Sequence, residues 1–251
     1  MAQRGTLAYK IRHSLTHPWR IIPAIVRTAK NAYINFTSRD QLVAHRRLIE
    51  VFASNNPNAA MGSDTEENWL SAGKLQFDYL LEHGVKPHHR VLEIGCGNLR
   101  LGWHLIHYLS PAKYVGIDIS SQMLAHARRR IAQFNLQQKT PFLFLTEDVD
   151  YTFLPERSFD WIIAYAVFVN SSVESIALVI AAVAPLLAEG GYFDFTYYET
   201  DGAPYCFQGA YYYHNRESIA SIVEKTGLHS EWLGMSWDAR QMRVRLTRKA
   251  I

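Results

Sequence analysis

The sequence predicts an α/β fold: a seven-stranded, mostly parallel sheet with helices on both faces, an antiparallel C-terminal strand pair, and a helical N-terminal extension. Three observations predict it. From residue 90 onward, short β-rich runs alternate with helical runs, which is the pattern of a parallel sheet covered by helices. A glycine-containing turn joins the first strand to the first helix of this series. Two strand-like runs follow the last helix with no helix between them, which indicates one antiparallel strand.

The composition and the cysteine count exclude several classes of protein. Apolar residues make up 48% of the 251 residues and charged residues 20%, which is typical of a globular chain and not of a disordered one. With Cys96 and Cys206 as the only cysteines, the sequence favours a reducing cytoplasm over a disulfide scaffold or a cysteine-based zinc site. No secretory signal is expected. The longest apolar run, residues 176–188, is too short to span a bilayer and predicts a buried helix.

Seven short segments are expected to form the strands. Each is rich in β-branched or aromatic residues and is bounded by turn-forming residues or a helical run. The expected strands span residues 90–94, 114–119, 142–148, 159–166, 191–199, 229–235 and 241–249. The expected helices span residues 69–84, 101–109, 121–134, 173–188 and 216–227. Ser120 or Ser121 is expected to cap the third of these helices, and Gly227 to end the last.

Residues 1–65 are expected to form a basic helical extension and linker, ahead of an α/β domain at 66–251. Residues 1–53 predict two or three helices, and the polar, turn-rich stretch 55–68 predicts a linker or mobile lid. The first 60 residues carry nine Lys or Arg against two acids, a net charge of +7. Such an arm suits an anionic membrane surface, a second subunit, or packing on the domain. We favour packing onto the domain or a second subunit over a membrane surface, because Pro18 and Pro23 interrupt a long surface helix.

The segment VLEIGCGNLRLG, residues 91–102, predicts a ligand-binding loop. A glycine turn between a strand and a helix brings backbone N–H groups close to a ligand at the positive end of the helix dipole. Dinucleotides and S-adenosylmethionine (SAM) both bind such loops. The dinucleotide pattern requires glycine at positions 95, 97 and 100, but position 100 is an arginine.

Acidic residues around the loop favour SAM. Glu93, two residues before Gly95, is expected to meet the amino group of the methionine part of SAM, whereas it would repel a pyrophosphate. Asp118, at the end of the second strand, suits the ribose hydroxyls of either cofactor. Asp148, at the end of the third expected strand, is placed to meet the adenine amino group.

From about residue 69 to the C-terminus, these features resemble the class I SAM-dependent methyltransferases, which have a Rossmann-like fold. The first motif of that family is an acid followed by G-x-G-x-G, and here it reads E-I-G-C-G-N-L. Leu99 replaces the third glycine, and we expect its branched side chain to force a different loop path. The resemblance implies SAM as the cofactor, bound by Glu93, Gly95, Cys96, Gly97, Asn98, Asp118, Ile119, Met123, Asp148, Val149 and Ala164. A second similarity, over residues 77–120, is to bacterial methyltransferases of sugars, glycolipids and other small products.

Acceptor groups in this fold lie beyond the fourth and fifth strands, where the chain is rich in tyrosine. Tyr rings stack on apolar faces while their hydroxyls form hydrogen bonds, so this region suits a sugar or aromatic acceptor. The residues expected to bind it are Tyr165, Tyr198, Tyr211 and Tyr213, with His214 as general base and Glu199 as second choice. The same tyrosines also suit packing of the loop onto the domain. A metal bound by Glu199, Asp201 and His214 is an open alternative, although none is expected.

The sequence therefore predicts a SAM-dependent methyltransferase that acts on a hydroxyl of a small molecule, such as a sugar, glycoside or glycolipid. An N-methyltransferase of a small amine and a non-catalytic SAM-binding partner subunit are the alternatives. The fourth strand lacks the Asn-Pro-Pro-aromatic motif of DNA adenine methyltransferases, so nucleic acid is not expected as a partner. A cytoplasmic location is expected, with membrane association through the basic arm as the alternative.

Overall fold

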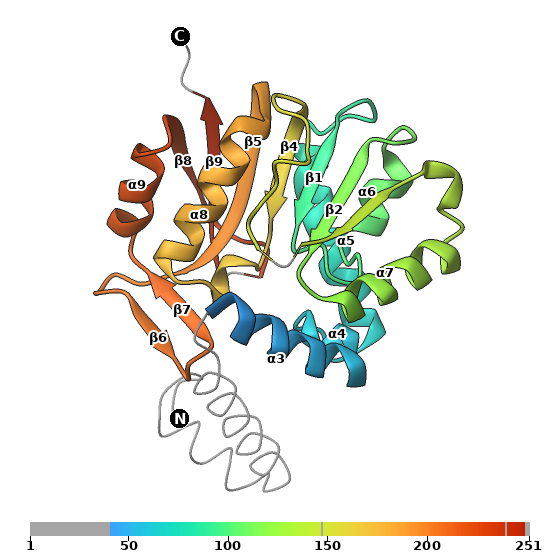
Figure 1. Ribbon diagram of the computed structural model, residues 1–251, viewed down its shortest axis with the longest axis horizontal. Coiled ribbons are helices and arrows are strands. Elements are labelled where there is room, and N and C mark those ends of the chain that lie inside the picture. Colours follow the sequence, from blue (N-terminus) through green and yellow to red (C-terminus); the bar gives the residue numbers. More distant parts are fainter. Residues whose placement is uncertain (1–40, 147, 239, 249–251) are drawn as a thin grey trace, which may run out of the picture.

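The computed structural model describes residues 41–146, 148–238 and 240–248 as an α/β fold (Figure 1). The helices expected before residue 41 and most of the basic arm lie outside this range, so the predictions about arm contacts stay predictions. Within it, no helix is both long and apolar enough to cross a membrane.

One mixed sheet forms the centre of the described structure. Its strand order is β3-β2-β1-β4-β5-β7-β6, and β9 pairs antiparallel with β5 and with β8. The strands are β1 (Val91–Ile94), β2 (Tyr114–Asp118), β3 (Phe142–Leu145), β4 (Phe159–Ala164), β5 (Leu187–Glu199), β6 (Tyr205–Phe207), β7 (Tyr211–His214), β8 (Leu228–Met235) and β9 (Met242–Arg248). The mostly parallel sheet and the antiparallel C-terminal pair are confirmed.

The strand count differs from the expected seven because of a hairpin. Strands β6 and β7 pair antiparallel in a stretch expected to be a loop, and β7 extends the sheet by pairing parallel with the end of β5. Strand β5 also begins at Leu187, four residues before the expected 191. The apolar run 176–188 is therefore not one helix, since α8 (Val173–Val183) and a short 3-10 turn end before it does.

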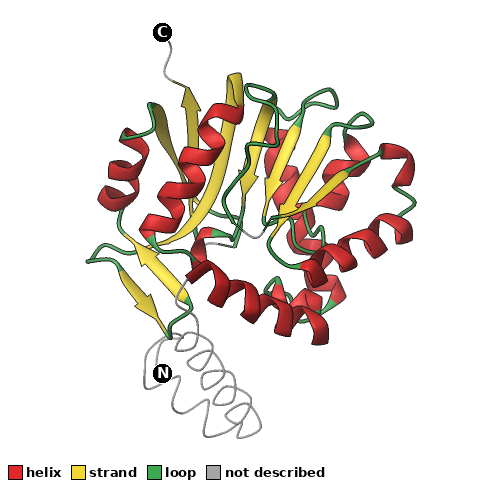
Figure 2. Cartoon of the chain, viewed as in Figure 1, coloured by secondary structure: helices red, strands yellow, loops and turns green. Residues whose placement is uncertain are grey.

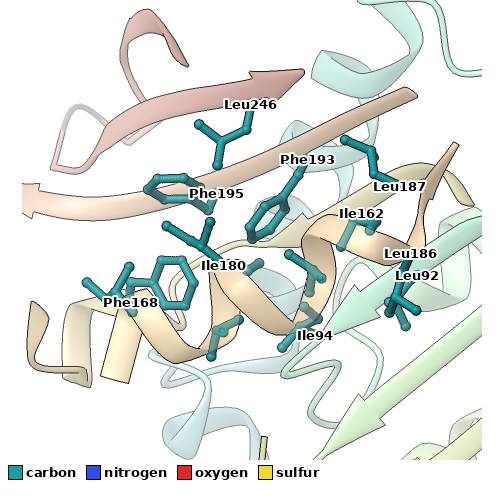
Figure 3. Packing of buried hydrophobic residues seen from close by; sticks show 14 of the residues in the cluster. Leu92, Ile94, Ile162, Phe168, Ile180, Leu186, Leu187, Phe193, Phe195 and Leu246 are labelled. Carbon is teal, nitrogen blue, oxygen red and sulfur yellow. The ribbon is translucent and has the colours of Figure 1, made fainter. Parts of the chain in front are cut away.

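Helices cover both faces of the sheet (Figure 2). The helices are α3 (Gln41–Asn55), α4 (Pro57–Ala60), α5 (Glu66–Glu82), α6 (Gly102–Tyr108), α7 (Ser121–Gln133), α8 and α9 (Arg216–Glu224). Helices α5, α6 and α7 pack on one face, and α8 and α9 on the other. On the face covered by α8 and α9, Phe168 and Ile180 pack against Phe193 and Phe195 of β5 (Figure 3). Five of the described helices begin with a side-chain cap, by Asn56, Thr65, Ser120, Ser172 and Asn215.

Helices α3 and α4 lie along the edge at which the parallel strands end (Figure 1). The carboxylate of Glu50 on α3 accepts a hydrogen bond of 2.7 Å from the backbone N–H of Ser121, at the start of α7. A carboxylate at this position stabilises a helix N-terminus. The chain before α5 thus packs beside the carboxyl edge of the sheet, where a parallel α/β sheet binds its ligands.

Candidate active site

The loop after β1 has a backbone that requires glycine. Gly95 and Gly97 have φ angles of 66° and 54°, in the left-handed region that side chains disfavour. A Cβ on Gly95 would overlap the side chain of Val167, and a Cβ on Gly97 would overlap that of Met61. The two glycines therefore allow close approach as well as a tight turn.

Leu99 does not redirect this loop, so the expectation of a different path is wrong. Its φ is 68°, which is the conformation a glycine would adopt. A leucine in this region is strained by about 1–2 kcal/mol. Its side chain is fully buried among residues of α5, α6 and α7, and this burial offsets the strain.

Glu93 is a buried acid without a charged hydrogen-bond partner in the described structure. It is 6% exposed, and its Oε2 accepts a 2.6 Å hydrogen bond from the Tyr114 hydroxyl. Burial raises the pKa of Glu93 to about 8, against the opposing effects of this hydrogen bond and the nearby Arg100 charge. The Arg100 guanidinium donates to the backbone carbonyl of Met61. A bound cation near Glu93 would favour its ionised form.

Asp118 joins the end of β2 to the glycine loop. Its Oδ2 accepts from the backbone N–H of Gly97 at 2.7 Å, and its Oδ1 from that of Ser120 at 2.8 Å. Burial raises its pKa to about 6, while these hydrogen bonds oppose the shift. Each carboxylate oxygen keeps a second lone pair, so Asp118 is able to accept further hydrogen bonds from a diol.

The other residues expected to bind the cofactor differ in burial and in their contacts. Met123 is buried beside Gly97, Ala164 is buried at the end of β4, and Ile119 is half-buried. The side chain of Asn98 is bound to Trp69 and Asn58. Burial raises the pKa of the Cys96 thiol, so this thiol stays protonated and unreactive.

Asp148 does not end the third strand. Strand β3 ends at Leu145, and Asp148 lies in the turn beyond it, exposed and accepting the backbone N–H of Asp150 at 3.1 Å. Val149 is half-buried and packs against the core. The placement of Asp148 at the strand end is therefore wrong, while an adenine contact from the turn stays a prediction.

Three tyrosines form a ladder across the hairpin. Tyr198 on β5, Tyr213 on β7 and Tyr205 on β6 are direct neighbours in the sheet register. The ring centroids lie 5.1 Å apart for Tyr198 and Tyr213 and 4.7 Å for Tyr213 and Tyr205, with both pairs stacked. Tyr211 approaches Tyr198 at 6.3 Å. Phe207, opposite Tyr211, is 46% exposed, so we call these five residues the aromatic face.

Tyr165 does not join the aromatic face. It follows the end of β4, is buried, and packs against Tyr79 of α5 and Trp237, with centroids at 6.5 Å and 5.0 Å. Burial raises the pKa of its phenol, and the hydroxyl has no hydrogen-bond partner among the described residues. Of the four expected acceptor residues, the structure brings together Tyr198, Tyr211 and Tyr213.

One of the two expected bases is enclosed and the other is paired. His214 is 2% exposed; its Nε2 donates to the carbonyl of Ser171 at 2.9 Å, and its Nδ1 is buried without a partner among the described residues. Burial lowers the pKa of His214. Glu199 accepts from the Tyr197 hydroxyl at 2.9 Å and pairs with Arg216 at 3.3 Å. In the described ranges, no three His, Cys, Asp or Glu side chains gather as they would around a metal ion.

Two groups of contacts near the site were not assigned from sequence. One is made by the segment expected to be a linker or lid, where Asn58, Met61 and Glu66 reach the glycine loop and α7. The other is the hairpin, with Tyr205 and Phe207. A sequence signal for the hairpin exists: Gly209 lies in a three-residue stretch, 208–210, between two aromatic runs, as in a short hairpin loop that contains glycine. No comparable sequence signal marks the contacts of the first group.

Comparisons with known proteins agree with this geometry. Residues 92–193 match a family model described as a methyltransferase domain. Malonyl-[acyl-carrier protein] O-methyltransferase 1 of Ilyobacter polytropus is 29% identical over 116 residues, 45% of this chain and 41% of that protein. The chain thus matches about two fifths of the length of this curated relative.

Solved structures show the same fold. Magnesium protoporphyrin IX methyltransferase from Synechocystis PCC 6803, with bound SAM, is similar with a TM-score of 0.62 at 16% identity, over 85% of this chain and 99% of that one. A SAM-dependent methyltransferase from Clostridium acetobutylicum is similar with a TM-score of 0.57 at 14% identity, over 80% and 98%.

The sheet order, the glycine loop and the acid after β2 define a Rossmann-like α/β fold, in which ligands bind at the carboxyl edge of the sheet. Within this fold, residues 92–193 match the methyltransferase-domain model, and the similar solved structures are methyltransferases.

Proposed function

We propose that the protein transfers a methyl group from SAM to an oxygen atom of a small molecule. The observation that carries the proposal is the pair of buried acids, Glu93 and Asp118, around a loop that requires glycine. In this proposal, Glu93 binds the ammonium group of the methionine part and Asp118 the ribose hydroxyls. The residues fit the cofactor, because the burial of Glu93 is compensated when a cation binds beside it.

The aromatic face is the proposed acceptor surface. It lies on β5, β7 and β6, with Tyr205, Phe207 and Tyr211 exposed by 49%, 46% and 38%. SAM supplies an electrophilic methyl group, and the task of the protein is to hold the acceptor oxygen in line with it. Because the rings of the ladder stack on one another, they offer an acceptor their apolar edges and phenol hydroxyls. They do not enclose a cation, which favours oxygen over amine acceptors.

Two oxygen chemistries remain for the acceptor. A sugar hydroxyl, the acceptor expected from the sequence, needs a base to remove its proton. A carboxylate is ionised at neutral pH and needs none. Because His214 is enclosed and Glu199 is paired with Tyr197 and Arg216, the described structure favours a carboxylate. The name of the curated relative, an O-methyltransferase of a malonyl-carrier protein, is consistent with this choice.

The test is a single-turnover assay with labelled SAM over a panel of sugars and small carboxylic acids. We expect transfer to a carboxylic acid, with a rate that is flat above about pH 6 because the acceptor is already ionised. A His214→Gln variant should then keep its rate per folded molecule. A rate that rises with pH and falls about 100-fold in this variant would instead identify a hydroxyl acceptor and His214 as its base. Absence of SAM binding in calorimetry would overturn the proposal altogether.

A further inference from the structure

Residues 50–69 form a strap that contacts the proposed cofactor site at three points. The strap comprises the end of α3, helix α4 and the start of α5, and it follows the edge where the parallel strands end (Figure 1). At the first point, the Glu50 carboxylate accepts the backbone N–H groups of Ser121 and Gln122 at 2.7 and 3.4 Å. These residues begin α7, three and four positions after Asp118, so the strap is anchored next to the proposed ribose site.

At the second point, Met61 lies against the glycine loop. A Cβ built on Gly97 would overlap the sulfur and methyl carbon of Met61, so the Met61 side chain occupies the space that the missing side chain of Gly97 leaves open. The Met61 backbone carbonyl accepts a hydrogen bond from Arg100 of the same loop. A ligand that approaches Gly97 from this side must displace the Met61 side chain.

At the third point, a polar latch holds the strap. Asn58 accepts from Nδ2 of Asn98 at 2.8 Å and donates to Glu66 at 2.7 Å. Both nitrogens of the Arg130 fork donate to Glu66 at 2.6 Å, and the guanidinium lies 4.3 Å from the ring centre of Trp69. The latch therefore links the strap to the glycine loop and to α7.

The strap is bound by polar groups more than by a core. Helix α4 has no buried residue, and the Glu66 side chain is 47% exposed. Trp69, at the end of the strap, is fully buried and donates to Asn98 at 2.7 Å. Exposed ion pairs are individually weak. The segment between residues 56 and 66 is thus able to lift without opening the core, while Trp69 holds its C-terminal end.

We propose that this strap is the gate of the cofactor site and that the Asn58–Glu66–Arg130 latch sets how fast the cofactor enters and its product leaves. The inference rests on the proposed function, since it takes SAM as the ligand of the glycine loop. In the closed strap, Met61 covers Gly97. Lifting the segment from Asn58 to Met61 uncovers the loop, and reclosure retains the ligand.

The test compares latch variants with a matched control. Arg130→Ala and Glu66→Gln remove the latch, and Glu66→Gln keeps the size of the side chain if Arg130→Ala proves too unstable. Lys74→Ala is the control, because it breaks an exposed ion pair with Asp78 on the same helix α5, away from the strap. Stopped-flow fluorescence measures association of SAM and dissociation of its demethylated product, S-adenosylhomocysteine, for each full-length protein.

We expect both latch variants to raise association and dissociation rates about fivefold, with a smaller change in affinity, as loss of one such ion pair from the closed state predicts. Hydrogen exchange over residues 56–63 should accelerate in these variants and not in Lys74→Ala. Unchanged rates, or faster dissociation without faster association, would overturn the gate and leave the strap as a fixed wall. Failure of the wild-type protein to bind SAM would instead overturn the proposed function.

Discussion

The two ends of the proposed reaction site are built in different ways. At the cofactor end, Glu93 and Asp118 are 6% and 7% exposed and are held by hydrogen bonds to Tyr114, Gly97 and Ser120. At the acceptor end, the aromatic face is largely exposed, and its order comes from stacking of rings in register. The cofactor end is preorganised for one ligand by buried charge, whereas the acceptor end offers area and shape.

The two ends should therefore differ in how strongly they discriminate among ligands. A buried acid is costly without its partner, so it discriminates strongly among ligands. A stacked aromatic surface contributes affinity with little discrimination between flat ligands. We therefore expect substitutions at the cofactor end to abolish or retune binding, and substitutions at the acceptor end to weaken it gradually.

The largest effect is expected for Gly97→Val. A β-branched side chain at a φ of 54° is strained, and its Cβ overlaps Met61. SAM affinity measured by calorimetry should fall at least about 100-fold, equivalent to about 3 kcal/mol. Gly84→Val is the matched control, since Gly84 has a φ of 93° with no atom within 4 Å of the added Cβ. If the control loses SAM binding equally, backbone strain alone accounts for the loss.

A pH dependence of SAM affinity is the second expected effect. Below pH 8 the Glu93 carboxyl is protonated in the free protein, and an ammonium ligand requires it to ionise. Affinity should therefore rise with pH, by up to about tenfold per pH unit between pH 6 and 8, and level off above. By the same linkage, the free protein should lose stability as pH rises from the unfolded-state pKa of glutamate toward 8. Glu93→Gln, which retains an acceptor for Tyr114, should flatten both profiles. A slope that persists in this variant would assign the proton to another group.

The sequence predicts the cofactor end better than the acceptor end. Glu93, Gly95, Gly97 and Asp118 are recognisable because each stands at a strand end within a short stretch of chain. The hairpin joins β6 and β7 to β5, and its register depends on pairing between separate segments. The strap contacts pair residues up to 72 positions apart, such as Asn58 with Arg130, and no local pattern encodes them. Residue type also does not reveal burial. His214 and Tyr165 were expected to face the acceptor, but both are enclosed.

At the acceptor end, Tyr213→Ala should act more mildly. Tyr213 is the middle ring of the ladder, stacked on both Tyr198 and Tyr205, so its removal interrupts the surface. The KM for the acceptor should rise about tenfold with SAM affinity unchanged, because each aromatic stack is worth about 0.5–1.5 kcal/mol. Phe142→Ala is the control, an exposed aromatic residue on β3 at the opposite end of the sheet. An equal rise in KM for the control would remove the aromatic face from the acceptor site.

The smallest effect on cofactor binding is expected at Leu99, although it stands inside the glycine motif. Leu99→Gly relieves the strain at a φ of 68° and leaves the loop path unchanged, so SAM affinity should stay within about threefold of the wild type. Stability should nevertheless fall by about 2–4 kcal/mol in urea unfolding, because a fully buried leucine side chain is lost from the cluster formed with α5, α6 and α7. The leucine would then be a core residue that tolerates a glycine conformation. A tenfold change in SAM affinity with little loss of stability would show the opposite, that this side chain shapes the cofactor end itself.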